Sequence, residues 1–304
     1  MNLVFHIGYH KTGTSWLQQV YFPAHPDIRT ICNSREPWND EFLQGLIGTS
    51  DRKFDAEECR VLLKEQIEGV REDRRDSVIL VSAERLSGHP FSGGYDSLRI
   101  AERIHACAPE ARIFCALRNQ IDMMSSVYKQ LVAEGMPGKF EDLLHARHWK
   151  GVGFAPNFYE YDRMVTKYHS LFGANRCLFV PYELMRSDIS GYLGKLCEFL
   201  GVPKISAPKT NGVVNRSLPS RGLNAFRRLN YFRRTEINPF PMVTLNKYLY
   251  NGINRMLSLV YSALPPKRDI LDTQQQAWIR EYYHTSNGKL NRLLGYDIGY
   301  PTSG

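Results

Sequence analysis

The stretch HIGYHKTGTS, from His6 to Ser15, decides the fold that we expect for this chain. Gly8 and Gly13 have the separation of the two glycines of a phosphate-binding loop, in which Lys and Ser or Thr follow the second glycine. The lysine here is Lys11, which stands two residues before the second glycine. An apolar run precedes the loop and a helical pattern follows it. The stretch therefore predicts a strand, a tight turn and a helix whose N–H groups face an anion.

Apolar runs and helical patterns alternate along the first two thirds of the chain. Buried strands are expected at 2–8, 77–84, 112–118 and 176–183, and helices at 14–22, 54–73, 93–109 and 189–203. Near-continuous apolar strands that alternate with helices are typical of a parallel sheet covered on both faces. The sequence predicts an α/β fold, a three-layer P-loop-like domain with a central, mainly parallel sheet and a helical C-terminal extension.

The composition of the chain changes near residue 203. A loop rich in Pro, Gly, Ser and Asn comes first, and 223–264 then mixes arginines with Phe, Tyr, Leu and Met. A last helix is expected at 273–295, with a break near Ser286–Gly288. With 304 residues the chain can form one large domain or two small ones. We expect a single domain over 1–304, with an α/β core at 1–221 and a helical extension at 222–304 as a candidate acceptor side.

The charge and the cysteines limit the classes of protein. A net charge of +8 suits an anionic ligand, nucleic acid, a membrane surface or an ordinary basic surface, and does not choose among them. The six cysteines form no C-x-x-C pair, which argues against a metal site and fits a reducing compartment. No signal peptide pattern occurs, and no apolar run approaches the roughly 18 residues of a membrane span. We expect a cytoplasmic protein.

A second segment, LRNQIDMMSSVYKQ at 117–130, follows the third predicted strand and opens a helix. Arg118 stands at the carboxyl end of that strand, and Ser126 follows eight residues later. In open α/β sheets, ligands bind outside the carboxyl ends of the strands. Arg118 is therefore expected to face the same crevice as the first loop and to bind phosphate through its guanidinium group. A surface ion pair with Asp122 is the alternative.

Together the two segments resemble the sulfotransferases that use 3′-phosphoadenosine-5′-phosphosulfate (PAPS). HIGYHKTGTSWLQ at 6–18 is similar to their 5′-phosphosulfate loop, and 117–130 is similar to their 3′-phosphate segment. Four further segments resemble the family: LFVPYELMRSD (178–188), YLGKLCEFLGVP (192–203), VVNRSLPSRG (213–222) and YYHTSNGKLNRLLG (282–295). Within the family, the chain is most similar in character to bacterial and glycan-modifying members. The resemblance covers most of the chain, and implies PAPS as co-substrate and PAP as product, with no metal required.

The resemblance also implies roles for single residues. Lys11 would stabilise the negative charge that grows on the leaving oxygen. The 5′-phosphate would be bound by a set of loop residues, Lys11, Thr12, Gly13, Thr14 and Ser15. Arg118 and Ser126 would bind the 3′-phosphate.

The adenine and the late closing loop have weaker candidates. Trp16 would lie near the adenine, although a core aromatic side chain fits the same position equally well. Tyr182 is a second candidate for the adenine side. Arg216 and Arg221 lie in the segment that resembles the family's closing loop, but the usual Arg-Lys-Gly of that loop is missing.

An acceptor hydroxyl must lose a proton as it attacks, so a general base is expected. Glu84 ends the second predicted strand and therefore lies on the reactive side of the sheet. A glutamate in this region resembles the base of glycan sulfotransferases. In many small-molecule members of the family, a histidine has that role. Glu84 is our candidate base, and a carboxylate paired with Arg85 or Arg118 is the alternative. The rival bases are His6, His10 and His89.

The acceptor is expected to carry a hydroxyl on a carbohydrate or glycolipid, and the alternative is a lipid, steroid or phenolic alcohol. The basic and aromatic residues 223–264 are candidates for an acceptor cleft, for a peripheral membrane contact or for ordinary packed helices. A P-loop kinase that uses ATP and Mg²⁺ is the second alternative function. Such a kinase would have a Lys next to Thr14 and an Asp at a strand end, whereas this chain has Lys11 and Glu84. A nucleic-acid binder would leave the loop and Arg118 unexplained, so no nucleic-acid partner is expected.

Overall fold

The computed structural model describes residues 2–32, 39–71, 77–144, 154–208, 218–265 and 269–302. The chain divides into two compact units. The first unit comprises Met1–Asn119, Ala155–Val214 and Tyr283–Gly304, and the second comprises Gln120–Phe154 and Asn215–Tyr282. The expected division into a core at 1–221 and an extension at 222–304 stays a prediction.

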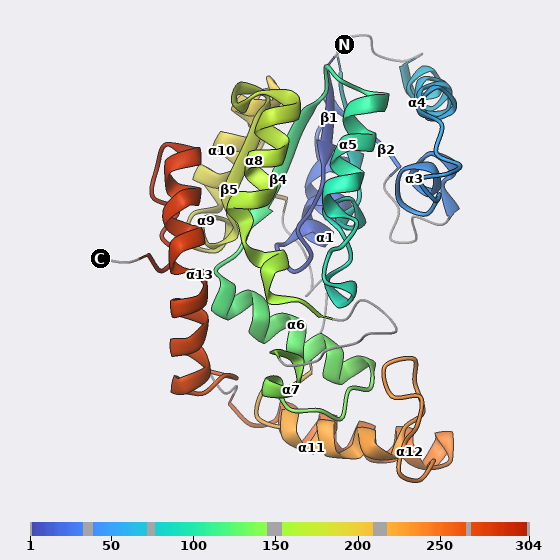
Figure 1. The fold of residues 1–304 in the computed structure, drawn as a ribbon, viewed down its shortest axis with the longest axis vertical. Coiled ribbons are helices and arrows are strands. Elements are labelled where there is room, and N and C mark those ends of the chain that lie inside the picture. The colour runs from blue at the N-terminus through green and yellow to red at the C-terminus, as the bar shows by residue number, and fades with distance from the viewer. Residues whose placement is uncertain are drawn as a thin grey trace. The chain divides into compact units, whose positions relative to one another are not determined.

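The first unit is built on a five-stranded sheet in the order β2-β3-β1-β4-β5 (Figure 1). Its strands are β1 (Leu3–His6), β2 (Ile28–Ile31), β3 (Val78–Ser82), β4 (Arg112–Leu117) and β5 (Cys177–Pro181). Every neighbouring pair is parallel. In the central strand, Val4 lies opposite Leu80 on one side and Arg112 on the other. The predicted α/β fold with a parallel central sheet is confirmed.

Strand β2 is absent from the sequence-based prediction. Its residues are IRTI, in which only Ile28 and Ile31 are buried. β2 pairs with β3 alone, so it forms one edge of the sheet. An edge strand is not enclosed on all sides and needs no continuous apolar run, and a four-residue strand with two polar residues leaves little signal.

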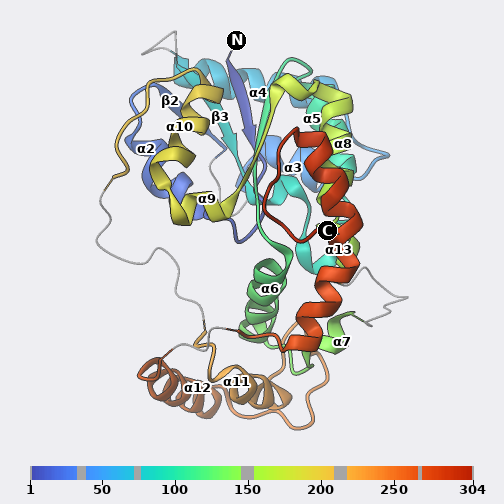
Figure 2. The same cartoon turned by 90° about the vertical axis from the view of Figure 1, so that its left-hand side faces the viewer.

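Helices cover both faces of the sheet. On one face, buried residues of β1, β3 and β4 pack against the helical residues 14–24 and against α10 (Ile189–Leu200). Figure 2 shows α10 with α2 (Phe22–Ala24) and α9 (Tyr182–Ser187) on that side. On the other face lie α5 (Ser97–Cys107) and α8 (Tyr161–Phe172), with α3 (Glu41–Ile47) and α4 (Ala56–Arg71) beyond. Short 3₁₀ turns occur at Glu84–Ser87, Pro90–Ser92, Pro156–Tyr159, Ala174–Arg176 and Asn230–Phe232.

The helix after β1 begins at Thr14, as predicted, and continues to Ala24. It consists of α1 (Thr14–Trp16), a π-helical turn at Leu17–Tyr21 and α2. Helix α10 ends at Gly201, which has a φ of 70° and accepts the left-handed conformation that closes many helices. The helix predicted at 189–203 therefore begins where expected and ends at Leu200.

The second unit is helical in the residues that the structure describes. It contains α6 (Gln120–Glu134), α7 (Phe140–Leu144), α11 (Leu223–Leu229) and α12 (Lys247–Ser262). The buried Asn230 ties the end of α11 to α6, because its Nδ2 donates to the carbonyls of Val132 (2.7 Å) and Met136 (3.0 Å).

The last helix, α13, runs without interruption over Thr273–Leu294, so the predicted break near Ser286–Gly288 is wrong. Ser and Asn can disturb a helix when their side chains bond to its own backbone. Here the Ser286 hydroxyl donates to Asp162, and Asn287 donates to the carbonyl of Pro301 (2.9 Å). No helix in the described part of the chain is both long enough and apolar enough to cross a bilayer. The cytoplasmic location stays a prediction.

Candidate active site

The loop after β1 runs beside β4 before it turns. The N–H of Ile7 donates to the Phe114 carbonyl (3.0 Å), and that of Tyr9 donates to the Ala116 carbonyl (3.2 Å). In return the N–H of Ala116 donates to the Gly8 carbonyl (2.9 Å). The loop is therefore fixed to the sheet up to Tyr9, and the residues that follow lie at the carboxyl end of the strands.

Two glycines make the turn possible. Gly8 has a φ of 107°, Gly13 a φ of 79° and, between them, Lys11 a φ of 64°. A Cβ on Gly8 would lie 3.2 Å from the backbone oxygen of Glu84, and one on Gly13 would lie 2.7 Å from Sδ of Met185. Both positions favour glycine for their conformation, and at Gly8 the backbone of Glu84 also leaves little space for a Cβ.

The loop ends in a helix N-terminus. Gly13 is the N-cap residue and has no side chain to cap the helix, while its carbonyl accepts from the N–H groups of Trp16 (3.0 Å) and Leu17 (3.2 Å). The first N–H groups of a helix have no acceptor within the helix and carry a partial positive charge. Thr12 is buried, and its hydroxyl donates to the Tyr9 carbonyl (2.6 Å), which holds the turn. The arrangement suits an anion.

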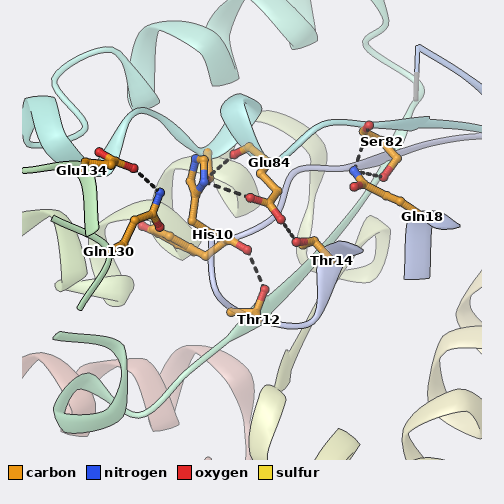
Figure 3. A network of polar contacts seen from close by, with 10 residues as sticks. His10, Thr12, Thr14, Gln18, Ser82, Glu84, Gln130 and Glu134 are labelled. Atoms are coloured by element: carbon orange, nitrogen blue, oxygen red, sulfur yellow. Dashed lines mark hydrogen bonds and ion pairs between the residues drawn. The ribbon is translucent and has the colours of Figure 1, made fainter. Parts of the chain in front are cut away.

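Glu84 lies next to this loop. Strand β3 ends at Ser82, earlier than predicted, and Glu84 opens a 3₁₀ turn two residues later. The Thr14 hydroxyl donates to Oε1 of Glu84, and Nδ1 of His10 lies 2.9 Å from Oε2. Figure 3 shows the carboxylate between the two side chains. The two oxygens of Glu84 are thus held by two residues of the loop.

The alternative ion pairs of Glu84 do not form within the described residues. Arg85 pairs with the buried Asp96, and Arg118 bonds to the loop backbone. Burial alone would raise the pKa of Glu84. The hydrogen bond from His10, together with the positive charges of His10 and Lys11, outweighs burial and holds the pKa of Glu84 below its ordinary value. Glu84 is therefore a carboxylate at neutral pH.

The three rival histidines differ in position. His6 is buried, its Nδ1 lies 2.7 Å from Oγ of Ser82, and burial lowers its pKa to about 4. Burial, with nearby positive charge, also lowers the pKa of His89 to about 4. Of the three, only His10 contacts Glu84. His10 therefore belongs to the candidate site, as the partner of the carboxylate.

Arg118 follows β4 directly and reaches the same loop. Its Nη1 donates to the Lys11 carbonyl (2.9 Å), and its Cζ lies 5.1 Å from the centroid of the Tyr182 ring. The Tyr161 hydroxyl donates to the Arg118 carbonyl (2.8 Å). The Nε of Arg118 is buried and has no hydrogen-bond partner among the residues that the structure describes. A fixed guanidinium group with a spare buried donor fits an anionic ligand such as a phosphate group.

The two aromatic candidates for the adenine lie at different places. Tyr182 begins α9 instead of ending a strand, and its ring lies beside Gly13. Trp16 is half-buried, packs against the core and stacks on Tyr21, with ring centroids 5.8 Å apart. The contacts of Trp16 are those of an aromatic side chain at the edge of the core. The adenine contacts of both residues stay predictions.

Two residues near the site were not predicted. Gln18 is buried and its Nε2 donates to the carbonyl (3.2 Å) and the hydroxyl (3.0 Å) of Ser82, which links the first helix to β3. Glu183 accepts from the N–H of Asn119 (2.9 Å) and from the Tyr300 hydroxyl (3.2 Å). The available signals were the place of Gln18 one helical turn after Thr14, and the Tyr-Glu pair at the start of α9.

The remaining candidates are less closely defined. Ser15 is half-buried in the first turn of the helix. Ser126 lies on α6 in the second unit, so its pairing with Arg118 stays a prediction. Arg216 lies outside the described residues, and Arg221 is exposed. Within the described ranges, no three His, Cys, Asp or Glu side chains are grouped in a way that could hold a metal ion.

Two solved structures are similar to this chain over most of its length. A crystal structure of a sulfotransferase from Alicyclobacillus acidocaldarius has a TM-score of 0.58 at 18% sequence identity, covering 97% of this chain and 96% of that one. This likeness shows the fold. The mouse sulfotransferase SULT7A1 complexed with PAP has a TM-score of 0.43 at 15% identity, with 97% and 88% covered. A search of curated proteins found no match.

The family is decided by the sequence itself. The model of one family, described as the sulfotransferase family, matches residues 4–206, which include the loop after β1, Glu84 and Arg118. This match covers more than half of the chain, and on this basis the predicted enzyme class, a PAPS-dependent sulfotransferase, is confirmed. The chain belongs to the sulfotransferase family.

Proposed function

We propose that this enzyme transfers the sulfuryl group of PAPS to a hydroxyl group of a carbohydrate or glycolipid, with Glu84 as the general base. The observation that carries the proposal is the position of Glu84, whose carboxylate is held by Thr14 and His10 directly at the anion-binding loop. A base and an anion site that share residues suit the in-line transfer of an anionic group to an alcohol.

The residues of the loop would hold the 5′ end of the co-substrate, which supplies the sulfuryl group when bound. The helix start at Thr14 and Ser15 offers backbone N–H groups, and Lys11 offers a cation for the charge that develops on the leaving oxygen. Gly13 supports this role because its φ of 79° gives the turn that leads into the helix start. These are the roles that the resemblance to the family implies.

Arg118 would select the 3′-phosphate, with Ser126 as its predicted companion. The spare Nε of Arg118 and its fixed guanidinium plane support this assignment, because a guanidinium group binds phosphate through two parallel N–H donors. The neighbouring Tyr182 ring restricts the plane of the group. An anion bound at Arg118 would distinguish PAPS from nucleotides that lack a 3′-phosphate.

The proton of the acceptor hydroxyl would move to Glu84. Because its pKa lies below the ordinary value, the side chain has lost its proton at neutral pH, which is the form in which it can act as a base. Each carboxylate oxygen can accept two hydrogen bonds, so those from Thr14 and His10 leave a site on each oxygen. His10 would fix the direction of the carboxylate.

The identity of the acceptor is the finer part of the proposal. A glutamate in this place resembles the base of glycan sulfotransferases, which favours a sugar hydroxyl. A lipid, steroid or phenolic alcohol is the second candidate, and the exposed apolar side chains of the second unit, such as Phe240 and Leu259, favour it. The family assignment decides against the kinase alternative, in which ATP and Mg²⁺ would occupy the loop.

The test is sulfate transfer from radiolabelled PAPS to four acceptors, an oligosaccharide, a glycolipid, a steroid and a phenol. We expect the carbohydrate or glycolipid to be labelled, and Glu84→Gln to reduce kcat by about 10²- to 10⁴-fold, the usual contribution of a general base. The matched control is Glu65→Gln, which changes an exposed carboxylate on α4. Labelling of the steroid or phenol alone would contradict the proposed acceptor, and an active Glu84→Gln enzyme would contradict the proposed base.

A further inference from the structure

Exposed apolar side chains are concentrated in one segment of the second unit, and we name this set the apolar surface of residues 231–264. Most of the large apolar side chains that are exposed in the described residues lie there: Tyr231, Phe232, Ile237, Phe240, Met242, Val243, Tyr248, Leu249, Met256, Leu259, Val260 and Leu264. Single exposed apolar residues are common in proteins, but so many of them within one short segment indicate an interaction site.

Helix α12 contributes two apolar sides instead of one. Its inner side contains the buried Tyr250 and packs towards α11, where the rings of Phe226 and Tyr261 are 6.3 Å apart. Figure 2 shows the two helices next to each other. The outer side is also apolar, because at about 100° per residue a separate set of exposed residues falls within a third of the circumference. This set is Tyr248, Leu249, Met256, Leu259 and Val260.

The loop before α12 holds further apolar side chains away from the unit. Phe240 is 89% exposed and Met242 is 76% exposed. The loop is fixed at its base, because Nδ2 of Asn238 donates to the carbonyls of Asn230 (2.8 Å) and Arg233 (3.0 Å). In addition the N–H of Met242 donates to the carbonyl of Tyr231 (2.9 Å). The hydrogen bonds at the base of the loop therefore hold Phe240 and Met242 in their exposed positions.

The charge of this surface and of the adjoining helix α11 identifies the partner. Residues 218–265 contain seven Lys and Arg residues and a single acidic residue, Glu236. The exposed ones among them are Arg221, Arg228, Arg234, Lys247 and Arg255. A second copy of this chain would bring the same positive charges against one another. An anionic lipid bilayer matches both features, because it attracts basic residues and accepts aromatic and aliphatic side chains at its headgroup level.

We propose that the apolar surface of residues 231–264 docks the enzyme on an anionic bilayer. Phe240, Met242 and the outer side of α12 would enter the headgroup region, and the arginines and Lys247 would lie among the lipid phosphates. The enzyme would then meet acceptors that are themselves held in a membrane. Docking goes beyond sulfuryl transfer and is tested without PAPS or an acceptor.

The experiment is sedimentation of the full chain with vesicles of phosphatidylcholine, with or without phosphatidylglycerol. We expect binding to the vesicles that contain phosphatidylglycerol, and weaker binding as salt is added. The double variant Phe240→Ser, Leu259→Ser is expected to bind about tenfold or more weakly, because burial of apolar area drives interfacial binding. The matched control is Val61→Ser, Leu98→Ser, which changes two exposed apolar residues of the first unit and is expected to bind like the wild type.

Two results would overturn the proposal. One is vesicle binding that is either absent at low salt or equal for the wild type and the Phe240→Ser, Leu259→Ser variant. The other is a dimer in solution that the same variant converts to a monomer, since the surface would then join two copies of the chain. Thermal unfolding with PAP serves as the check on folding. A variant that no longer binds vesicles but keeps its PAP-induced shift is folded and still binds the cofactor. Loss of vesicle binding is then distinguished from loss of the PAP site on which the proposed function rests.

Discussion

Nδ1 of His10 lies 2.9 Å from Oε2 of Glu84, so that a histidine of the anion-binding loop directly contacts the candidate base. The hydrogen bond and the charge of His10 are the main causes that lower the pKa of Glu84 against the effect of burial. The reactivity of the carboxylate is therefore tied to a residue on another strand–loop segment.

Replacing His10 by Asn is expected to raise the pKa of Glu84, because the interactions that favour the charged carboxylate are weakened. A base is active when it has lost its proton, so the acidic limb of the kcat/KM profile should move to higher pH. Activity at the plateau should fall by a smaller factor than in Glu84→Gln. An acidic limb that disappears in His10→Asn, with Glu84→Gln unchanged from the wild type, would instead identify His10 as the base.

The buried His6 predicts a dependence of stability on pH. Its pKa is about 4 in the folded chain and 6.5 when unfolded, so the unfolded chain binds the additional proton. The contribution of His6 to the free energy of unfolding should be complete above about pH 6.5. The free energy of unfolding should then fall by about 3 kcal/mol as the pH approaches 4. Urea unfolding of the wild type and His6→Asn at several pH values measures the effect. The slope should be smaller in the variant, and equal slopes would contradict the account.

Gly13 and Gly69 provide a matched pair of substitutions. Gly13→Ala forces a side chain into a φ of 79° and towards Met185, so we expect a loss of about 1–2 kcal/mol of stability and weaker PAP binding. Gly69 lies in α4 with open space around it, and Gly69→Ala should stabilise the chain by up to about 1 kcal/mol. Thermal unfolding with and without PAP compares the two. A Gly13→Ala protein as stable as Gly69→Ala would show that the turn is not constrained.

Much of the fold and part of the site could be predicted, because their signals are local in the sequence. The glycines at 8 and 13 and the apolar runs of β1, β3, β4 and β5 each lie within a few residues. Arg118 could be predicted because it directly follows a strand, and the carboxyl ends of parallel strands share one edge of the sheet.

The contacts that were missed join residues far apart in the chain. His10 and Glu84 meet because β1 pairs with β3, with His6 opposite Ser82, so that the segments after both strands lie side by side. The strand order decides this pairing, and apolar periodicity does not reveal the order of strands. Strand β2 was missed because an edge strand needs few apolar residues.

The most direct test of the central claim is thermal unfolding with PAP, ADP and ATP–Mg²⁺, for the wild type, Arg118→Ala and the control Arg176→Ala. Arg176 is a partly exposed arginine that pairs with Glu110. A ligand at a hundred times its Kd stabilises the native state by about 2.7 kcal/mol. We predict a shift with PAP that exceeds the shift with ADP, is lost in Arg118→Ala and persists in Arg176→Ala. Stabilisation by ATP–Mg²⁺ without an effect of PAP would contradict the assignment of the loop and Arg118 to PAPS.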